Sequence, residues 1–186
     1  PVLTDIDDHR LTTRRDHSIG CPSESKRGDR NPFTRISNSR QRQMQRRNRA
    51  RLGEAGKRNM EQAVAFLAAN RDREGIVETN SGLQYKIIKQ GNGPSPKLSD
   101  TVRTHYRGTL LDGTEFDSSF RSGQPAEFPV AAVIPGWTEA LQSMHVGDKW
   151  QLFIPPQLAY GANPPGPPIE PNQLLVFEIE LVGISQ

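Results

Sequence analysis

The hydrophobic and polar positions of this chain follow different periods in different regions. From residue 76 onward apolar side chains alternate with polar ones, which is the pattern of strands with one buried face. The clearest run is 175–181, where four large apolar residues face one way while Glu178 and Glu180 face the other. Asp112-Gly113 between two such runs predicts a hairpin turn. Strands are predicted at 83–87, 102–111, 114–117, 128–130, 150–154 and 175–181.

One helical period interrupts the strands. Apolar residues recur at i, i+3, i+4 and i+7 in Trp137, Ala140, Leu141 and Met144. Pro135 stands at the first helical position, which tolerates a missing N–H, and Gly147 supplies a stop. We therefore predict one short helix packed on the apolar face of an antiparallel sheet, an α+β architecture. This spacing leaves two interpretations of Trp137 open: a plain core side chain, or the floor of an apolar cleft.

The first part of the chain lacks these patterns. A helix is predicted from about Glu54 to Asn70, with Phe66 beside a single apolar stripe made of Met60, Ala63, Val64 and Leu67. That stripe needs a partner, either the following domain or a second copy of the chain. Residues 1–52 show no sustained period and are predicted to be a disordered tail. The predicted division is thus a basic low-complexity tail (1–52), an amphipathic helix and linker (53–75) and a folded domain (76–186).

Charge follows the same division. Residues 1–58 hold 15 Lys and Arg against 7 Asp and Glu, whereas the remainder holds 9 against 14, so that the net charge of +3 comes from the tail. A basic tail is typical either of nucleic-acid or anionic-membrane contact or of a solvated segment. We favour the solvated segment and expect no nucleic-acid partner, because the densest basic stretch, Arg35 to Arg58, has no interleaved aromatic residue to stack on bases.

Cys21 is the only cysteine and the four histidines are scattered, so the sequence predicts no disulfide within the chain and no metal site. No run approaches the roughly 18 apolar residues of a membrane span, and no apolar signal-peptide segment is visible.

Residues 155–173, called here the Pro-rich segment, have no regular pattern and contain five prolines after Tyr160. Irregular segments this long within a compact domain are functional or disordered in most cases. One interpretation is a polyproline ligand for the aromatic groove of another protein. The other is a rigid wall over a cleft, because prolines hold a loop at low conformational entropy.

Five motifs occur in one order along the second half. They are Thr104-His105-Tyr106-Arg107-Gly108, residues 112–119 (DGTEFDSS), Val133-Ile134-Pro135-Gly136-Trp137, Leu158-Ala159-Tyr160-Gly161 and Leu175-Val176-Phe177-Glu178. Together they resemble the FKBP-type peptidyl-prolyl cis–trans isomerases. The run 81–85 (SGLQY) after a helix is similar to the bacterial subgroup that includes the macrophage infectivity potentiator (Mip) proteins. The resemblance covers roughly residues 54–186.

This resemblance implies a half-barrel of five or six antiparallel strands wrapped on one short helix, with an aromatic pocket inhibited by macrolides such as rapamycin. It places Trp137 at the floor of the pocket, and it implies that the Ile134 N–H and the Tyr160 hydroxyl hydrogen-bond the bound peptide. The implied catalytic residues are Tyr106, Phe116, Asp117, Ile134, Trp137, Tyr160 and Phe177, and the implied substrate- or inhibitor-binding residues are Phe128, Val133 and Ile169.

The chain departs from the family pattern at three places. Ala126 stands where an aromatic residue is common. The basic residue often found near the Asp117 carboxylate would align with Ser122, which leaves Arg121 as a displaced candidate. The tip of the Pro-rich segment contains more prolines than the family pattern has there.

The implied activity is isomerisation of Xaa-Pro bonds in folding proteins, without cofactor or metal. A client-binding chaperone or holdase with weak isomerase activity is the alternative. Implied partners are proline-containing peptides, unfolded proteins and macrolides, together with a homodimer through the N-terminal helix. Related bacterial proteins are found in the cell envelope (periplasm or outer membrane) and in the cytoplasm, so the compartment stays open.

Overall fold

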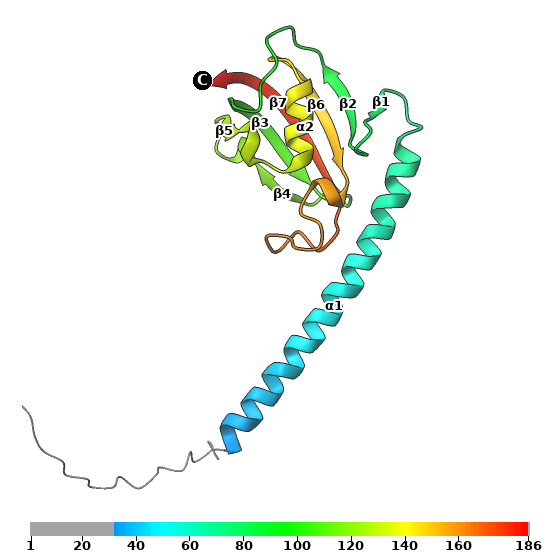
Figure 1. Cartoon of the computed structure of the whole chain (residues 1–186), viewed down its shortest axis with the longest axis vertical. Coiled ribbons are helices and arrows are strands. Elements are labelled where there is room, and N and C mark those ends of the chain that lie inside the picture. Colours follow the sequence, from blue (N-terminus) through cyan, green and yellow to red (C-terminus); the bar gives the residue numbers. More distant parts are fainter. Residues whose placement is uncertain (1–31, 186) are drawn as a thin grey trace, which may run out of the picture. The chain divides into compact units, whose positions relative to one another are not determined.

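The computed structural model describes residues 32–185. They form two α-helices, α1 (Pro32–Asn70) and α2 (Pro135–Ser143), and short 3₁₀ helices at Ser119–Arg121, Val130–Ala132 and Pro156–Leu158. The strands are β1 (Ile76–Glu78), β2 (Gln84–Lys89), β3 (Thr101–Thr109), β4 (Glu115–Ser118), β5 (Ala126–Pro129), β6 (Lys149–Ile154) and β7 (Leu175–Ser185) (Figure 1). The chain divides into two units, residues 1–40 and 41–186, and the second contains all seven strands and helix α2.

All strand pairs are antiparallel, in the order β1-β2-β6-β7-β3-β4, and β5 pairs with β3 beside β4. The α+β class with an antiparallel sheet is therefore confirmed. The sheet has seven strands, one more than the alternation of apolar and polar residues predicted. The additional strand is β1, which has only three residues and lies at the edge of the sheet. Strand β3 is shared by three neighbours: β7 runs along one side, and β5 and β4 divide the other.

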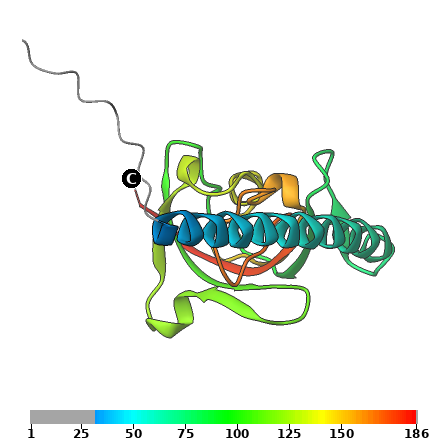
Figure 2. The ribbon, with the colours of Figure 1, turned by 90° about the horizontal axis from the view of Figure 1, so that it is seen from below.

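Helix α2 lies against the apolar face of this sheet, and the sheet curves around it (Figures 1 and 2). It begins at Pro135, as predicted, and the predicted apolar face is buried: Trp137, Ala140, Leu141 and Met144 are all at most 4% exposed. Opposite it, alternate residues of β7 point inward, so that Leu175, Phe177, Ile179 and Leu181 are also buried. The core of the domain is thus the layer between α2 and the sheet.

Helix α1 begins earlier than predicted, at Pro32 rather than near Glu54. The prediction was wrong because it relied on an apolar stripe, which residues 33–52 lack. Those residues contain neither Gly nor Pro and are rich in Arg and Gln, which are good helix formers. The part of the predicted tail before residue 32 lies outside the described residues.

The face of α1 that contacts the rest of the second unit also differs from the predicted stripe. Met60 and Val64 are exposed (37% and 61%), and the buried face, called here the docking face, is formed by small and polar side chains at Ala55, Gly56, Asn59, Ala63 and Asn70. Small residues allow close approach, and the two Asn amides replace apolar contacts with hydrogen bonds. Toward the end of the helix, Phe66 meets Phe153 of β6 with ring centroids 5.6 Å apart.

Asn70 fastens the end of α1 to β2. Its Nδ2 donates to Gln84 Oε1 (2.9 Å), and Gln84 Nε2 in turn donates to the Leu67 carbonyl (2.9 Å). Both side chains are buried, so these hydrogen bonds satisfy the two amide NH₂ groups and Gln84 Oε1, while Asn70 Oδ1 has no partner among the described residues. Neither helix in residues 32–185 is at once long and apolar enough to span a bilayer.

Candidate active site

Strand β3 delivers the central tyrosine of the site. Its residues alternate in burial, so that Tyr106 and Gly108 face the core. The backbone of Tyr106 is held by a side chain: its N–H donates to Ser119 Oγ (2.9 Å), and that hydroxyl lies 3.3 Å from the Tyr106 carbonyl. Ser119 is buried in the 3₁₀ helix that follows β4. It thereby fixes the position of Tyr106, a role that its place in the motif did not reveal.

Trp137 is the centre of an aromatic cluster. Three rings meet its indole edge-on: Tyr106 at 5.3 Å and 80°, Phe128 at 5.6 Å and 82°, and Phe177 at 5.2 Å and 85°. Phe116 continues the cluster, 5.4 Å from Phe177. Edge-to-face contacts are a favoured arrangement of aromatic rings and restrict their rotation. The indole N–H has no hydrogen-bond partner among the described residues.

Gly108 makes room for two of these rings. A Cβ at this position would lie 2.6 Å from Phe116 Cζ and 2.8 Å from Phe177 Cε1. The rings therefore lie directly over the β3 backbone, which only a residue without a side chain permits. A glycine inside a strand run is the sequence signal for such a close approach.

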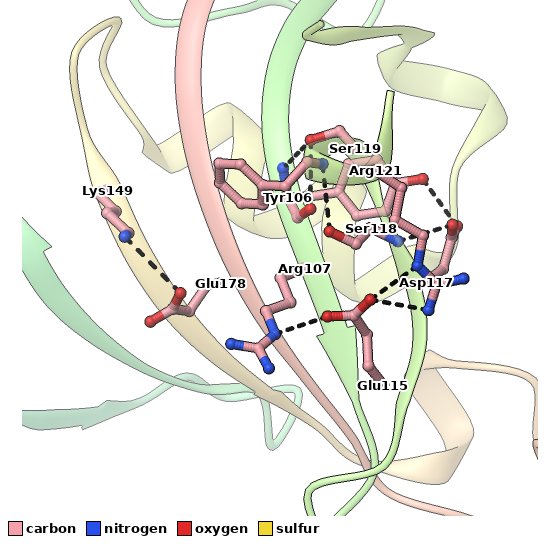
Figure 3. Close-up of polar contacts among 10 residues, drawn as sticks. Tyr106, Arg107, Glu115, Asp117, Ser118, Ser119, Arg121, Lys149 and Glu178 are labelled. Atoms are coloured by element: carbon pink, nitrogen blue, oxygen red, sulfur yellow. Dashed lines mark hydrogen bonds and ion pairs between the residues drawn. The ribbon is translucent and has the colours of Figure 1, made fainter. Parts of the chain in front are cut away.

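A polar pair adjoins the cluster. The Tyr106 hydroxyl donates to Asp117 Oδ2 (2.8 Å), and the Ser118 N–H donates to Asp117 Oδ1 (2.9 Å) (Figure 3). Burial raises the pKa of Tyr106 well above its usual value, and the hydrogen bond to the Asp117 carboxylate raises it further. The phenol is therefore protonated at neutral pH. The Asp117 side chain itself is exposed.

Arg121 does not approach Asp117 as its basic partner. Its Nη2 lies 2.8 Å from Glu115 Oε1, and Arg107 Nε lies 2.9 Å from the other oxygen of the same carboxylate (Figure 3). The hydrogen bond from Arg121, assisted by Arg107, lowers the pKa of Glu115. The displaced candidate thus belongs to an exposed ion-pair cluster on the β3–β4 hairpin.

These side chains surround a cavity of about 280 Å³. Its lining is Tyr106, Phe116, Asp117, Phe128, Ala132, Val133, Ile134, Trp137, Tyr160 and Phe177. Nine of the ten residues that the family resemblance implied are therefore brought together. Ala132 was missed, because a small residue in a 3₁₀ turn carries no chemical signal. The volume is near the lower end of the roughly 300–1,000 Å³ of small-molecule pockets.

Ile169 is the implied residue that does not line this cavity. It is 8% exposed, belongs to the buried core and borders a second hollow of about 770 Å³. That hollow is larger, but it lies between α1 and the Pro-rich segment and has no aromatic lining. We assign the site to the smaller cavity, because only there do aromatic rings and polar groups converge.

Ile134 lies where the cavity meets α2. It is the N-cap residue of the helix, and its carbonyl accepts hydrogen bonds from the Trp137 N–H (2.9 Å) and the Thr138 N–H (3.1 Å). The N–H of an N-cap residue lies outside the hydrogen-bond ladder of the helix. In the described part of the chain no group of three His, Cys, Asp or Glu side chains could hold a metal ion.

Two family models match the chain. Residues 93–182 match the FKBP-type peptidyl-prolyl cis-trans isomerase model, and residues 27–87 match the domain amino terminal to FKBP-type peptidyl-prolyl isomerase. Among curated proteins, the chain is 50% identical over 137 residues to the outer membrane protein MIP of Legionella longbeachae, covering 74% of this chain and 59% of that protein. It is 54% identical over 123 residues to the FKBP-type 22 kDa peptidyl-prolyl cis-trans isomerase of Escherichia coli, covering 66% and 60%. The chain thus spans about three-fifths of the length of these curated relatives.

Solved structures agree with these matches. FkpA from Escherichia coli superposes with a TM-score of 0.77 at 36% identity, over 87% of this chain and 75% of that one. A peptidyl-prolyl cis-trans isomerase from Pseudomonas syringae superposes with a TM-score of 0.66 at 40% identity, over 70% of this chain and 96% of that one. From its fold, its aromatic cavity and these matches, the chain belongs to the FKBP-type peptidyl-prolyl cis–trans isomerase family.

Proposed function

We propose that this protein accelerates the cis–trans isomerisation of Xaa-Pro peptide bonds in peptides and folding proteins. The observation that carries the proposal is the cavity of about 280 Å³ in which Trp137 is surrounded edge-on by three aromatic rings. A pyrrolidine ring is apolar, flat-sided and small, and it matches a hollow with aromatic walls.

The reaction needs no covalent catalyst. Resonance gives the peptide C–N bond partial double-bond character, with a barrier of about 18–20 kcal/mol, so that uncatalysed exchange at Xaa-Pro takes tens to hundreds of seconds. The twisted amide has lost this resonance and is less dipolar than the planar one. An apolar cavity therefore disfavours the planar form by desolvation, and this differential binding lowers the barrier.

Each part of the site has a role in this scheme. Trp137 supports the prolyl ring, while Phe116, Phe128, Val133 and Phe177 exclude water around it. The Ile134 N–H and the Tyr160 hydroxyl donate hydrogen bonds to the bound peptide. Tyr106 and Asp117 shape the electrostatic environment of the imide carbonyl and transfer no proton, because the raised pKa of Tyr106 keeps its phenol protonated.

A second candidate function is a client-binding chaperone or holdase with weak isomerase activity. The observation that favours it is the presence of exposed apolar side chains along α1: Met44, Leu52, Met60 and Val64 are between 37% and 66% exposed. Such residues offer contacts to unfolded chains, among basic side chains that hold the helix in solution. The same residues are available to a second copy of the chain in a homodimer.

Three finer points belong to the proposal. Macrolides such as rapamycin occupy the same cavity and inhibit the enzyme, because they compete for the Trp137 floor. The cell envelope is the compartment we favour, since one relative is named an outer membrane protein. The Pro-rich segment acts as a wall of the site rather than as a ligand for another protein, because Tyr160 at its start lines the cavity.

A protease-coupled assay on a short Xaa-Pro peptide, with and without rapamycin, separates the two functions. Isomerase function predicts catalysed exchange at enzyme concentrations far below that of the peptide, and its loss when rapamycin is added. Uncatalysed exchange, together with prevention of aggregation of an unfolded protein, would instead establish the holdase function.

A further inference from the structure

Helix α1 is hydrogen-bonded to the Pro-rich segment. The amide of Asn59, which is 6% exposed on the docking face, donates to the Pro171 carbonyl (3.0 Å) and to Glu170 Oε2 (3.3 Å). In the opposite direction, Asn172 Nδ2 donates to the Gly56 carbonyl (3.2 Å). Three hydrogen bonds thus join one turn of the helix to three consecutive residues, 170–172.

The two elements are also packed closely at this point. A Cβ on Gly56 would lie 3.1 Å from Pro171 Cβ and 3.3 Å from Asn172 Nδ2. Glycine is unfavourable inside a helix, so its presence here is explained by the approach of the segment. By contrast, the nearby salt bridge from Arg58 to Glu170 is long (3.7 Å) and its Arg is exposed, so it adds little.

The connection continues to the cavity. Asn172 has a left-handed backbone (φ 56°), and its N–H donates to the Gly161 carbonyl (2.7 Å). Gly161 directly follows Tyr160, and its own N–H donates to the Pro156 carbonyl (2.9 Å). Asn172 is therefore held by α1 through its side chain while its backbone holds the residue beside Tyr160. The segment, orange in Figure 1, has no strand ladder to hold it otherwise.

We propose that Asn59 is a positioning residue of the isomerase site: together with Gly56 and Asn172 it clamps the Pro-rich segment on α1 and so sets the place of the Tyr160 hydroxyl. The inference rests on the proposed isomerase function. When the clamp is released, the segment populates arrangements in which Tyr160 is displaced. The apparent dissociation constant of a prolyl peptide then rises in inverse proportion to the competent fraction.

The docking face contains its own control. Asn70 is, like Asn59, a buried asparagine on α1, but its partner is Gln84 of β2, and neither residue lines the cavity. Replacing Asn59 with alanine removes two part-buried hydrogen bonds donated by the side-chain amide, and replacing Asn70 removes one buried hydrogen bond donated by the same group. Of the two substitutions, only Asn59→Ala is expected to displace Tyr160.

The experiment compares the full-length wild type with Asn59→Ala, Asn70→Ala, Tyr160→Phe and the Asn59→Ala/Tyr160→Phe double variant. The measurements are kcat and KM on an Xaa-Pro peptide, and the melting temperature. We expect Asn59→Ala to raise KM by about three- to tenfold with kcat little changed, the factor for one or two ordinary hydrogen bonds. Asn70→Ala lowers the melting temperature about as much as Asn59→Ala does, but it leaves KM unchanged. In the Tyr160→Phe background, Asn59→Ala has little further effect, because both act through one hydroxyl.

Equal KM values for the Asn59 and Asn70 variants, or fully additive effects of Asn59→Ala and Tyr160→Phe, would overturn the clamp while leaving the isomerase function intact. An inactive wild type would instead overturn the function itself. Should Asn59→Ala fail to fold, Asn172→Gly carries the same test, because glycine keeps the left-handed backbone and removes only the bond to Gly56.

Discussion

The Tyr106 hydroxyl donates a 2.8 Å hydrogen bond to the Asp117 carboxylate across the paired strands β3 and β4. The phenol is buried beside Trp137, whereas the carboxylate is exposed. One polar contact thus joins the aromatic cluster to solvent. Because the acceptor is hydrated, its field at the bound imide is screened, and we expect this pair to tune the site rather than to dominate it.

Turnover is expected to be almost independent of pH between pH 6 and 8. The raised pKa of Tyr106 lies far above this window, so the phenol stays protonated throughout. Asp117→Asn keeps an acceptor for the phenol but removes the charge, and should lower kcat/KM by about threefold. Measured pH–rate profiles of both proteins test this. A titration centred in the window that disappears in Asp117→Asn would contradict it.

At alkaline pH, Tyr106 should make stability depend on pH. Its folded-state pKa is raised, so the folded state holds the phenol proton more tightly than the unfolded state. The contribution of Tyr106 to the free energy of unfolding is fully present below the pKa of the unfolded-state phenol, about 10. This contribution is lost as the pH rises from that pKa toward the higher pKa of the folded state. Urea unfolding at pH 8 and pH 11 measures the change. Tyr106→Phe should lose less stability than the wild type over that interval, and an equal loss would refute the assignment.

Trp137→Ala should remove affinity for macrolides and turnover while the far-ultraviolet circular dichroism stays near native. The truncation leaves a cavity that costs about 3–5 kcal/mol of the free energy of unfolding, so the melting temperature falls. Trp150→Ala is the matched control, because Trp150 stacks on Tyr85 (4.3 Å) and does not line the site. It should destabilise comparably and keep rapamycin affinity. Equal loss of affinity in both variants would favour a purely structural role for Trp137.

Gly108→Ala should damage the site through packing alone. Its methyl group would lie within 2.8 Å of the Phe116 and Phe177 rings, which have to move. We expect a loss of about 1–3 kcal/mol in the free energy of unfolding, with weaker peptide binding. Gly183→Ala is the control in β7, since no atom of residues 32–185 lies within 4 Å of its added Cβ; it should change stability by about 0.5 kcal/mol or less. Wild-type affinity in Gly108→Ala would contradict the proposed arrangement of the rings.

Sequence patterns predicted the parts of this fold that are stabilised by burial of apolar side chains and by local backbone preferences. The start of α2 at Pro135 and the inward face of β7 follow directly from backbone chemistry and alternation. The extent and docking face of α1 do not. Its contacts are made by Gly56 and Asn59, which carry no hydrophobic signal, and they involve residues more than 100 positions away.

The candidate site divides in the same way. Large aromatic residues such as Trp137 and Phe177 stand out in the sequence, and the family motifs name them. Gly108, Ser119 and Ala132 act by leaving space or by holding a backbone, and this depends on neighbours that the motifs do not specify. Ile169 does not line the cavity and belongs to the buried core, which the motifs do not distinguish from the pocket wall.

Exchange spectroscopy by NMR on a proline peptide tests the central claim most directly, because it observes rotation about the Xaa-Pro bond without a coupling protease. Substoichiometric wild-type protein should broaden the cis and trans signals and produce exchange peaks between them, and rapamycin should abolish this exchange. The Trp137→Ala variant should produce no such exchange. Peptide binding at the Trp137 cavity with no gain in the exchange rate would contradict the account.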